Sequence, residues 1–241
     1  RQGNPGLDPE YIDSYELSFQ KKFGRNVISI DGYYRITNNK IERYSTLYEN
    51  YTNVYLNTVE NVGNDYSFGT ELMFAFDITK WWHIDLMGNI YDYKVKGELP
   101  YQINDTTLIK DFSASSFNWN SRFNNTIKLS KTTRLQINGM YNSPTVTAQG
   151  RSEGFVMVAM AVKQDFFKNK FSATLQLRDL LNTAGHEFTS EGPNFTTYRK
   201  FEPYSPMFSI TLTYRINNYK PDRKRNGSSS EGMDDFSGEE F

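Results

Sequence analysis

Cysteine is absent from the 241-residue chain, which excludes disulfide scaffolds, thiolate zinc sites and cysteine nucleophiles. Net charge is nearly absent too, because 27 Lys and Arg stand against 28 Asp and Glu, for a formal charge of −1. Proteins that bind nucleic acid normally carry a marked basic excess, so no nucleic-acid partner is expected. Long apolar runs are also missing. The longest, Phe155 to Val162, is far shorter than the roughly 20 residues of a membrane-spanning helix.

Aromatic side chains, by contrast, are abundant: 18 Phe, 17 Tyr and 3 Trp make up 16% of the chain. The remainder is polar, and the mean hydropathy is −0.67. A polar chain this rich in rings requires an architecture that places many aromatic side chains at a boundary between water and an apolar phase.

Apolar and polar residues alternate with a period of two between positions 116 and 130. Phe117 and Trp119 occupy odd positions, while Asn118 and Arg122 occupy even ones. Period two places the two sets on opposite faces of a β-strand, whereas a helix would scatter the polar groups around its surface. Eight further segments share the pattern, so we predict an all-β, antiparallel fold of about nine strands without helices. Those segments are 15–23, 28–37, 67–78, 82–90, 134–141, 156–162, 171–178 and 208–216.

Short and long connections alternate between these segments. Strands of about 10–14 residues, joined alternately by tight turns and long loops, are typical of outer-membrane barrels, with the turns in the periplasm and the loops outside. The short connections are 24–26, 79–81, 131–133 and 168–170, and the long ones are 38–61, 96–115, 144–154 and 183–205.

Rings gather beside the expected short turns, as in the aromatic girdle of a transmembrane β-barrel. On this hypothesis the apolar face contacts outer-membrane lipids and the polar face lines the barrel. The alternative is a soluble β-sandwich, whose strands alternate in the same way. The expected membrane-interface aromatics are Phe23, Trp81, Trp82, Phe166, Phe167, Phe171 and Tyr214.

Nine strands are an odd number, whereas bacterial single-chain barrels have even numbers. An open sheet would leave two edges without backbone partners in hydrocarbon. We therefore expect residues 1–217 to be the C-terminal part of a larger barrel whose earlier strands lie outside the chain. Residues 218–241 are expected to form a disordered periplasmic tail because they are Ser-rich and charged. A periplasmic docking tail, or an assembly signal ending at Phe241, is the alternative.

Several short motifs follow one another over roughly residues 3–217. They are Asn4-Pro5-Gly6-Leu7-Asp8-Pro9-Glu10 with Ser14-Tyr15-Glu16-Leu17-Ser18-Phe19, Asp31-Gly32-Tyr33-Tyr34-Arg35, Asn61-Val62-Gly63 with Gly69-Thr70-Glu71, Tyr141-Asn142-Ser143-Pro144 with Gln149-Gly150, and Phe166-Phe167-Lys168-Asn169-Lys170-Phe171 with Arg178-Asp179-Leu180-Leu181-Asn182-Thr183. In their order and spacing these motifs resemble those of TonB-dependent outer-membrane receptors, and those of the Bacteroidetes-type outer-membrane protein β-barrels most closely.

The resemblance implies a 22-stranded barrel around an N-terminal plug, in the outer membrane of a Gram-negative bacterium. Such a receptor imports a scarce nutrient, of the siderophore, cobalamin, haem, glycan or peptide class, with energy transmitted by TonB. The plug, the earlier strands and the TonB-contacting region would then be partners outside this chain. Whether a surface lipoprotein also binds is left open by the resemblance.

The expected long loops are rich in Tyr and Asn, which suit ligand contact because they bind with little loss of conformational entropy. Packing of one loop on another is the alternative role for these side chains. The candidates for substrate contact are Tyr44, Tyr48, Tyr51, Tyr55, Tyr101, His186, Phe195 and Tyr198.

Chemistry-bearing motifs are scarce. The two histidines, His83 and His186, are too few for a metal site of their own, so no metal, cofactor or catalytic residue is expected. The acidic pairs near 234–240 stand in the expected tail, which cannot hold an acid and a base in catalytic geometry. The chain is therefore expected to act as part of an import receptor. The alternatives are a passive porin-like or surface-binding barrel, a soluble all-β binding domain and, least favoured, an enzyme.

Overall fold

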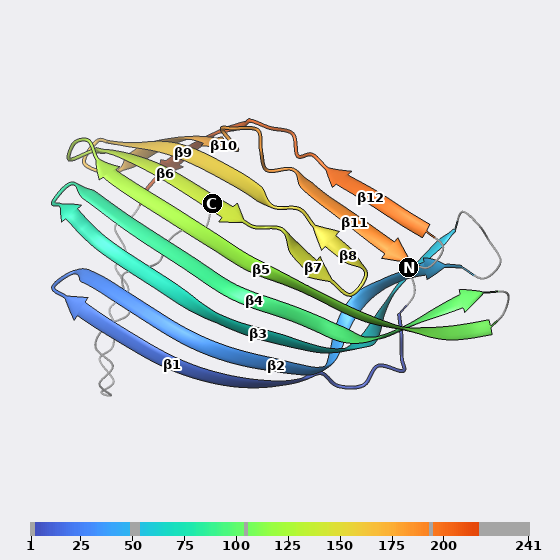
Figure 1. Ribbon diagram of the computed structural model, residues 1–241. Coiled ribbons are helices and arrows are strands. Elements are labelled where there is room, and N and C mark those ends of the chain that lie inside the picture. Colours follow the sequence, from blue (N-terminus) through green and yellow to red (C-terminus); the bar gives the residue numbers. More distant parts are fainter. Residues whose placement is uncertain (1–2, 49–53, 104–105, 193–194, 217–241) are drawn as a thin grey trace.

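The protein is seen in a computed structural model that describes residues 3–48, 54–103, 106–192 and 195–216. The described part is almost entirely β-strand, arranged in a sheet of nine strands and a second sheet of four (Figure 1). Within these ranges no helix is long and apolar enough to cross a membrane. The expected all-β antiparallel fold is confirmed.

Every neighbouring pair in the nine-stranded sheet is antiparallel, and strands adjacent in the sheet follow one another along the chain apart from the excursions into the small sheet. In order across the sheet the strands are β1 (Tyr11–Phe23), β2 (Asn26–Leu47), β3 (Tyr55–Thr79), β4 (Trp82–Ile103), β5 (Thr106–Lys128), β6 (Thr133–Asn142), β9 (Phe155–Phe166), β10 (Phe171–Arg178) and β13 (Met207–Tyr214).

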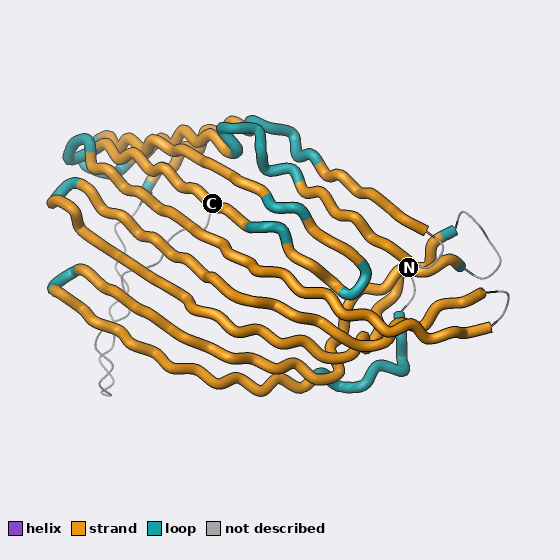
Figure 2. The backbone as a smooth tube through the Cα atoms, in the orientation of Figure 1, coloured by secondary structure: helices purple, strands orange, loops and turns teal. Residues whose placement is uncertain are grey.

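The small sheet is built from two of the connections that the sequence predicted to be long loops. Its order is β12 (Phe195–Phe201), β11 (His186–Gly192), β8 (Gly150–Ser152) and β7 (Thr145–Thr147). The prediction of long loops at 38–61 and 96–115 was wrong too. Strands β2 to β5 extend into these ranges as paired strands of 22 to 25 residues. The tight turns lie together at the end of the large sheet that is opposite to these long connections (Figure 2).

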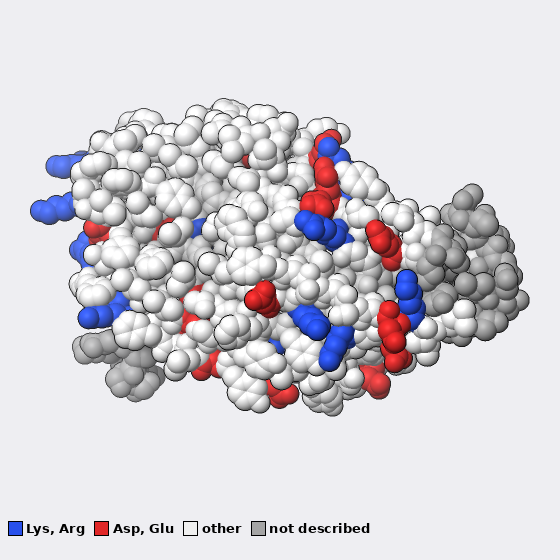
Figure 3. Space-filling view, viewed as in Figure 1, with Lys and Arg blue, Asp and Glu red and all other residues white. Residues whose placement is uncertain are grey.

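The register places apolar side chains of all nine strands on one face of the large sheet, which we call the apolar face. Leu86, for example, pairs with Phe74 on one side and Phe123 on the other. These side chains are open to the surroundings: Phe68 is 66% and Leu212 64% exposed. Figure 3 shows charged side chains gathered mainly toward the two ends of the strands, with a broad, sparsely charged area between them.

Polar side chains, in contrast, are buried on the other face, which we call the polar face. Asp65 is 4% and Asn118 2% exposed. The small sheet contacts this side, where Val146 N donates a hydrogen bond of 3.4 Å to Ser116 Oγ. A soluble sandwich would bury the rings and aliphatic groups between its sheets, so the distribution of polarity contradicts the sandwich alternative.

The apolar face has a definite height. On β4, Trp82, Ile84, Leu86 and Ile90 face this side, and the next position on it is Asp92. Ten residues at ~3.3 Å each, tilted by ~40°, rise about 25 Å, which is the height of the apolar band of a membrane barrel. Beyond Asp92, β4 runs on into the region that the sequence predicted to be extracellular.

The seven predicted interface aromatics lie at the tight-turn end of the sheet. Phe171 pairs with both Phe166 and Tyr214, and the ring centroids of Phe166 and Phe171 are 5.8 Å apart. Trp81 and Trp82 stack at 6.1 Å. Their contact with lipid headgroups stays a prediction. The predicted tail, 218–241, lies outside the described residues.

Two glycines allow the strands to divide into separate hairpins at the other end. Beyond Asn64 and Lys96, β3 no longer pairs with β4, so β2–β3 and β4–β5 continue as two separately paired arms. Gly63 has a φ of 123°, and a Cβ there would overlap Lys96 O, while one at Gly97 would overlap Val62 O. The two arms therefore cross at backbone contact.

Candidate functional site

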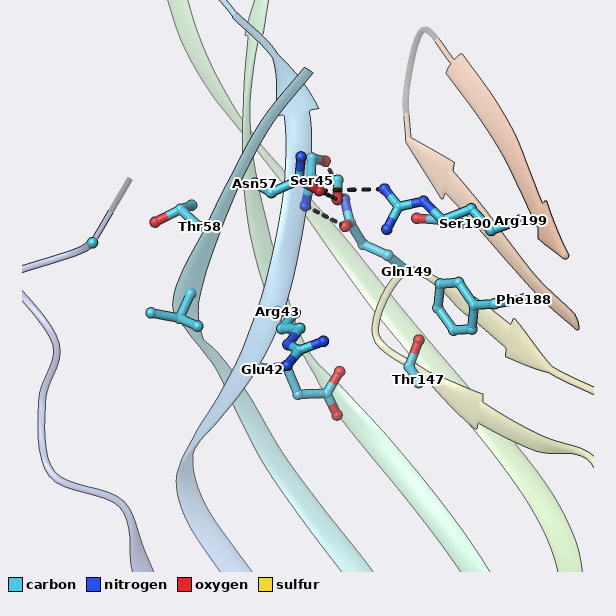
Figure 4. Close-up of a pocket in the computed structure, with 12 residues that line it drawn as sticks. Glu42, Arg43, Ser45, Asn57, Thr58, Thr147, Gln149, Phe188, Ser190 and Arg199 are labelled. Atoms are coloured by element: carbon cyan, nitrogen blue, oxygen red, sulfur yellow. Dashed lines mark hydrogen bonds between the residues drawn. The ribbon is translucent and has the colours of Figure 1, made fainter. Parts of the chain in front are cut away.

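A cavity of about 950 Å³ lies at the long-loop end, between the β2–β3 arm and the hairpins β7–β8 and β11–β12. Figure 4 shows the side chains converging on it from these elements, which are far apart in sequence. The lining residues are Gly3, Glu42, Arg43, Ser45, Asn57, Thr58, Val59, Thr147, Gln149, Phe188, Ser190 and Arg199.

Gln149 fastens the β7–β8 hairpin to the edge of β2. Its Nε2 donates to Ser45 O at 2.8 Å, and Ser45 N donates to its Oε1 at 2.8 Å (Figure 4). This edge of β2 is free because β1 begins at Tyr11, opposite Asn38. The side-chain amide therefore satisfies the two backbone groups that a neighbouring strand would otherwise satisfy.

Two further bonds fix the same hairpin. Ala148 N donates to Glu42 Oε2 at 3.0 Å, and Glu191 N donates to Gln149 O at 2.6 Å. The first anchors the hairpin to β2 and the second to β11. This side of the cavity is thus held by hydrogen bonds among β2, the β7–β8 hairpin and β11, which is the kind of preorganisation that recognition requires.

Asn57 of β3 connects Ser45 with Arg199 of β12 beside this contact. Its Oδ1 accepts hydrogen bonds from Ser45 Oγ at 2.9 Å and from Arg199 Nη2 at 3.3 Å. With Arg43 and Glu42, the cavity presents charges of both signs and several hydroxyl and amide groups. Such a surface suits the recognition of a polar solute through many hydrogen bonds.

The Asn4–Glu10 segment covers the outer side of the same arm. Asn4 Nδ2 donates to Val59 O at 3.1 Å and to Glu60 Oε2 at 2.9 Å, and Ile41 N donates to Glu10 Oε2 at 2.8 Å. Burial raises the pKa of Glu60 despite the bond from Asn4. This motif, singled out by the resemblance, therefore satisfies Ile41 N, which β1 leaves unpaired, together with Val59 O on β3.

The Arg178–Thr183 motif forms the turn that leads from β10 into the small sheet. Asp179 is 4% exposed, with a φ of 51°, and its carboxylate accepts hydrogen bonds from Thr183 N at 2.9 Å and Ala184 N at 3.2 Å. Burial disfavours the charged carboxylate, but bonds from Ser205 and these two amides outweigh it and lower the pKa of Asp179 below its usual value.

We expect Asp179→Ala to destabilise this turn by about 1–3 kcal/mol at neutral pH, since the buried Ala184 N–H and the partly buried Thr183 N–H lose their acceptor. A lowered folded-state pKa contributes stability above the unfolded-state pKa, and this is lost as the pH falls through the folded-state value. Hydrogen exchange of Thr183 and Ala184 at neutral pH and in acid checks this, with Asp13→Ala on the exposed β1 as control. Equal protection in variant and parent would contradict it.

The predicted substrate-contact residues lie around the cavity rather than in it. Tyr44 is 4% exposed and its hydroxyl donates to Pro100 O, so it joins the two arms, and burial raises its pKa. Tyr55 and Phe195 meet edge to face at 5.3 Å, and His186 packs against Phe155 at 4.2 Å.

Tyr48 and Tyr198 are 38% and 59% exposed, and a hydrogen bond with Glu187 raises the pKa of Tyr198. Tyr51 lies outside the described residues. Tyr101 belongs to β4, but its side chain is not among those described. None of the six candidates with described side chains lines the 950 Å³ cavity, so their contact with a substrate stays a prediction.

The cavity residues that sequence reasoning missed are mostly small, polar or charged, without a local motif. Gln149 was part of a resemblance motif, but its partner Ser45 is 104 positions away. Arg199 and Asn57 are 142 positions apart. Because the segments carrying them were interpreted as irregular loops, nothing in the sequence indicated that they meet.

We expect Gln149→Ala to release the β7–β8 hairpin from β2. The Ser45 amide should lose hydrogen-exchange protection by about tenfold, the equivalent of roughly 1.4 kcal/mol for a lost backbone partner. In Gln149→Glu the carboxylate still accepts from Ser45 N but cannot donate to Ser45 O, so an intermediate loss is expected. Thr147→Ala, in the same hairpin, is the matched control; protection unchanged in Gln149→Ala would contradict this role.

Ion pairs and hydrogen bonds continue down the polar face of the large sheet. Lys40 Nζ lies 2.6 Å from Asp65 Oδ2, which also accepts a hydrogen bond from Tyr93 at 3.2 Å. Near the tight turns, His83 bonds Asp77 at 2.7 Å and Asp85 at 3.0 Å through its two ring nitrogens. Over the described residues no group of three or more His, Cys, Asp or Glu side chains is arranged to hold a metal ion.

Comparison with known families gives one result for the chain. A family model described as the outer membrane protein beta-barrel family matches residues 1–214. Comparison with curated proteins finds none that matches. The matched range covers all the strands and the cavity, and it places the protein in the outer membrane.

Proposed function

The chain belongs to the outer membrane protein beta-barrel family, and we propose on that premise that it is the C-terminal part of a TonB-dependent import receptor. Its role would be transport rather than catalysis, with a plug and earlier strands supplied from outside the chain. The polar cavity at the long-loop end supports this because it stands where a solute arriving from outside would first be bound.

The observation that carries the proposal is the direction of the two edge strands. Eight antiparallel pairings separate β1 from β13, so the two run the same way. They cannot close the sheet by an antiparallel pairing, and unpaired edges are costly in hydrocarbon. We therefore expect an odd number of further strands to join them, and the 13 strands implied by a 22-stranded receptor satisfy this condition. A barrel of that size needs a plug to prevent leakage.

Uptake by cells producing the full-length protein tests the proposal. Accumulation of labelled vitamin B12, ferric siderophore, oligosaccharide and peptide would be compared with and without TonB. We expect one of these classes to be taken up saturably, and only with TonB. Uptake that is linear with concentration and indifferent to TonB would instead establish a passive porin-like barrel and overturn the proposal.

A further inference from the structure

Four methionines and one arginine form a single row across the polar face. Register pairs Met73 with Met87, Met87 with Arg122, Arg122 with Met140 and Met140 with Met157, on five neighbouring strands. The chain has seven methionines in all, so most of them stand in this row. Around it the polar face carries mainly amides, hydroxyls and charges, which makes an apolar row unusual.

The adjacent row, one step toward the long loops, has a different chemistry. Asp31 pairs with Glu71, Glu71 with Asn89, Asn89 with Asn120 and Asn120 with Asn142. Across the sheet, this adjacent row therefore consists of two carboxylates followed by three amides. Both rows border a cavity of about 370 Å³, lined by Ser29, Asp31, Glu71, Leu72, Met73, Met87, Gly88, Asn89, Asn120, Ser121, Arg122, Met140 and Asn142.

The opposite charges in this cavity are separated rather than paired. Asp31 Oδ2 accepts a hydrogen bond from Ser29 Oγ at 2.9 Å, but within the described residues neither Glu71 nor Arg122 forms an ion pair. Glu71 is on β3 and Arg122 on β5, two strand spacings apart, or about 10 Å. The strand between them contributes Asn89 and Met87.

We propose that this cavity binds a short peptide with free termini, about three residues long. An extended chain advances about 3.3–3.6 Å per residue, so the ends of a tripeptide are about 10 Å apart, matching the distance between the strands of Glu71 and Arg122. The ammonium group would face Asp31 and Glu71, and the carboxylate would face Arg122 as a charge-assisted partner.

The residues between the charges suit the middle of such a ligand. Asn120 offers both a donor and an acceptor to peptide groups, and Asn89 offers its Nδ2 donor, while its Oδ1 accepts a hydrogen bond from the Tyr33 hydroxyl at 3.1 Å. The thioethers of Met73 and Met87 adapt to apolar side chains of different shape, as methionines do on promiscuous binding surfaces. A free amino acid is too short to span both charges, and a neutral glycan would leave them unpaired. Arg122, between the methionine pairs, repels the soft metal cations that thioethers otherwise bind.

This inference deepens the proposed function by naming the substrate class, and its test is independent of energy coupling. Full-length protein, purified in nanodiscs without TonB, is titrated calorimetrically with Ala-Leu-Ala, its C-terminal amide and its N-acetyl form. We expect each blocked peptide to bind at least about tenfold more weakly, as for loss of one charge-assisted contact.

Two variants identify which residue of the cavity binds each terminus of the peptide. Arg122→Gln should abolish the preference for the free acid over the amide, while Glu71→Gln should abolish the preference for the free amine over the N-acetyl form. Arg134→Gln, on the same face near the tight turns, should change neither. Circular dichroism and heat-modified electrophoretic mobility confirm folding of each variant.

Absence of tripeptide binding to the folded parent, or equal affinity for free and blocked peptides, would overturn the inference. Preferences that survive in both variants would overturn it too. If uptake proves independent of TonB while these preferences hold, the proposed function fails and the peptide site stands.

Discussion

Leu86→Arg is expected to destabilise the protein in a bilayer by about 2–4 kcal/mol, the cost of an arginine near the middle of the apolar band. Leu86 is 41% exposed on the apolar face, between Phe74 and Phe123. The new guanidinium would therefore lie among acyl chains without a partner. Urea titration of the full-length protein folded into phosphatidylcholine vesicles measures the change.

Asn124→Arg is the matched control for this substitution. Asn124 is opposite Asp85 on the polar face, so an arginine there has a carboxylate nearby and remains hydrated. We expect its free energy of unfolding to change by less than about 1 kcal/mol. An equal loss of unfolding free energy in both variants would mean that the two faces of the sheet have the same environment, and would contradict the membrane-barrel account.

Gly97→Val is expected to be the most disruptive change in the two arms, β2–β3 and β4–β5. Even a Cβ at Gly97 would overlap Val62 O and crowd Gly63 Cα at 2.8 Å, and these atoms are backbone. The arms would have to separate, at a cost of about 1–3 kcal/mol or more. The contact of Tyr44 with Pro100 would be lost with them.

Hydrogen exchange of Val62 and Val95, which are buried at the crossing, follows this separation. Gly88→Ala is the control within β4, because a Cβ there meets its nearest atom, Asn120 O, at 3.8 Å. We expect faster exchange in the Gly97 variant alone. If exchange at the crossing is unchanged in Gly97→Val, the close approach of the two arms is wrong.

The part of the fold with one apolar face was predictable from sequence, and the part beyond it was not. In the first part apolar and polar residues alternate strictly, as in Phe117 and Trp119 against Asn118. Beyond Asp92 the period of two disappears along β4, although its pairing with β5 continues. Pro100 fits into this part of β4 because β4 pairs there only with β5, and a free strand edge tolerates proline.

The 950 Å³ cavity and the row of methionines on the polar face could not be predicted from the sequence either. Each depends on which residues of different strands become neighbours, and register is set by the whole sheet. Met73 and Met140, taken singly, are indistinguishable from ordinary apolar positions. Likewise, nothing in the sequence around Gln149 indicates that its side-chain amide will bond the backbone of Ser45 in place of a neighbouring strand.

The most direct test of the membrane-barrel account is the surroundings of successive side chains along β4. Because the chain has no cysteine of its own, spin labels can be placed singly at Ile84, Leu86 and Ile90, and at Asp85, Met87 and Asn89, in the protein embedded in bilayers. The account predicts that the first three labels collide with dissolved oxygen and are shielded from a water-soluble nickel chelate, while the second three are not lipid-exposed. Nickel contact at Ile84, Leu86 and Ile90, or loss of the two-residue period, would contradict it.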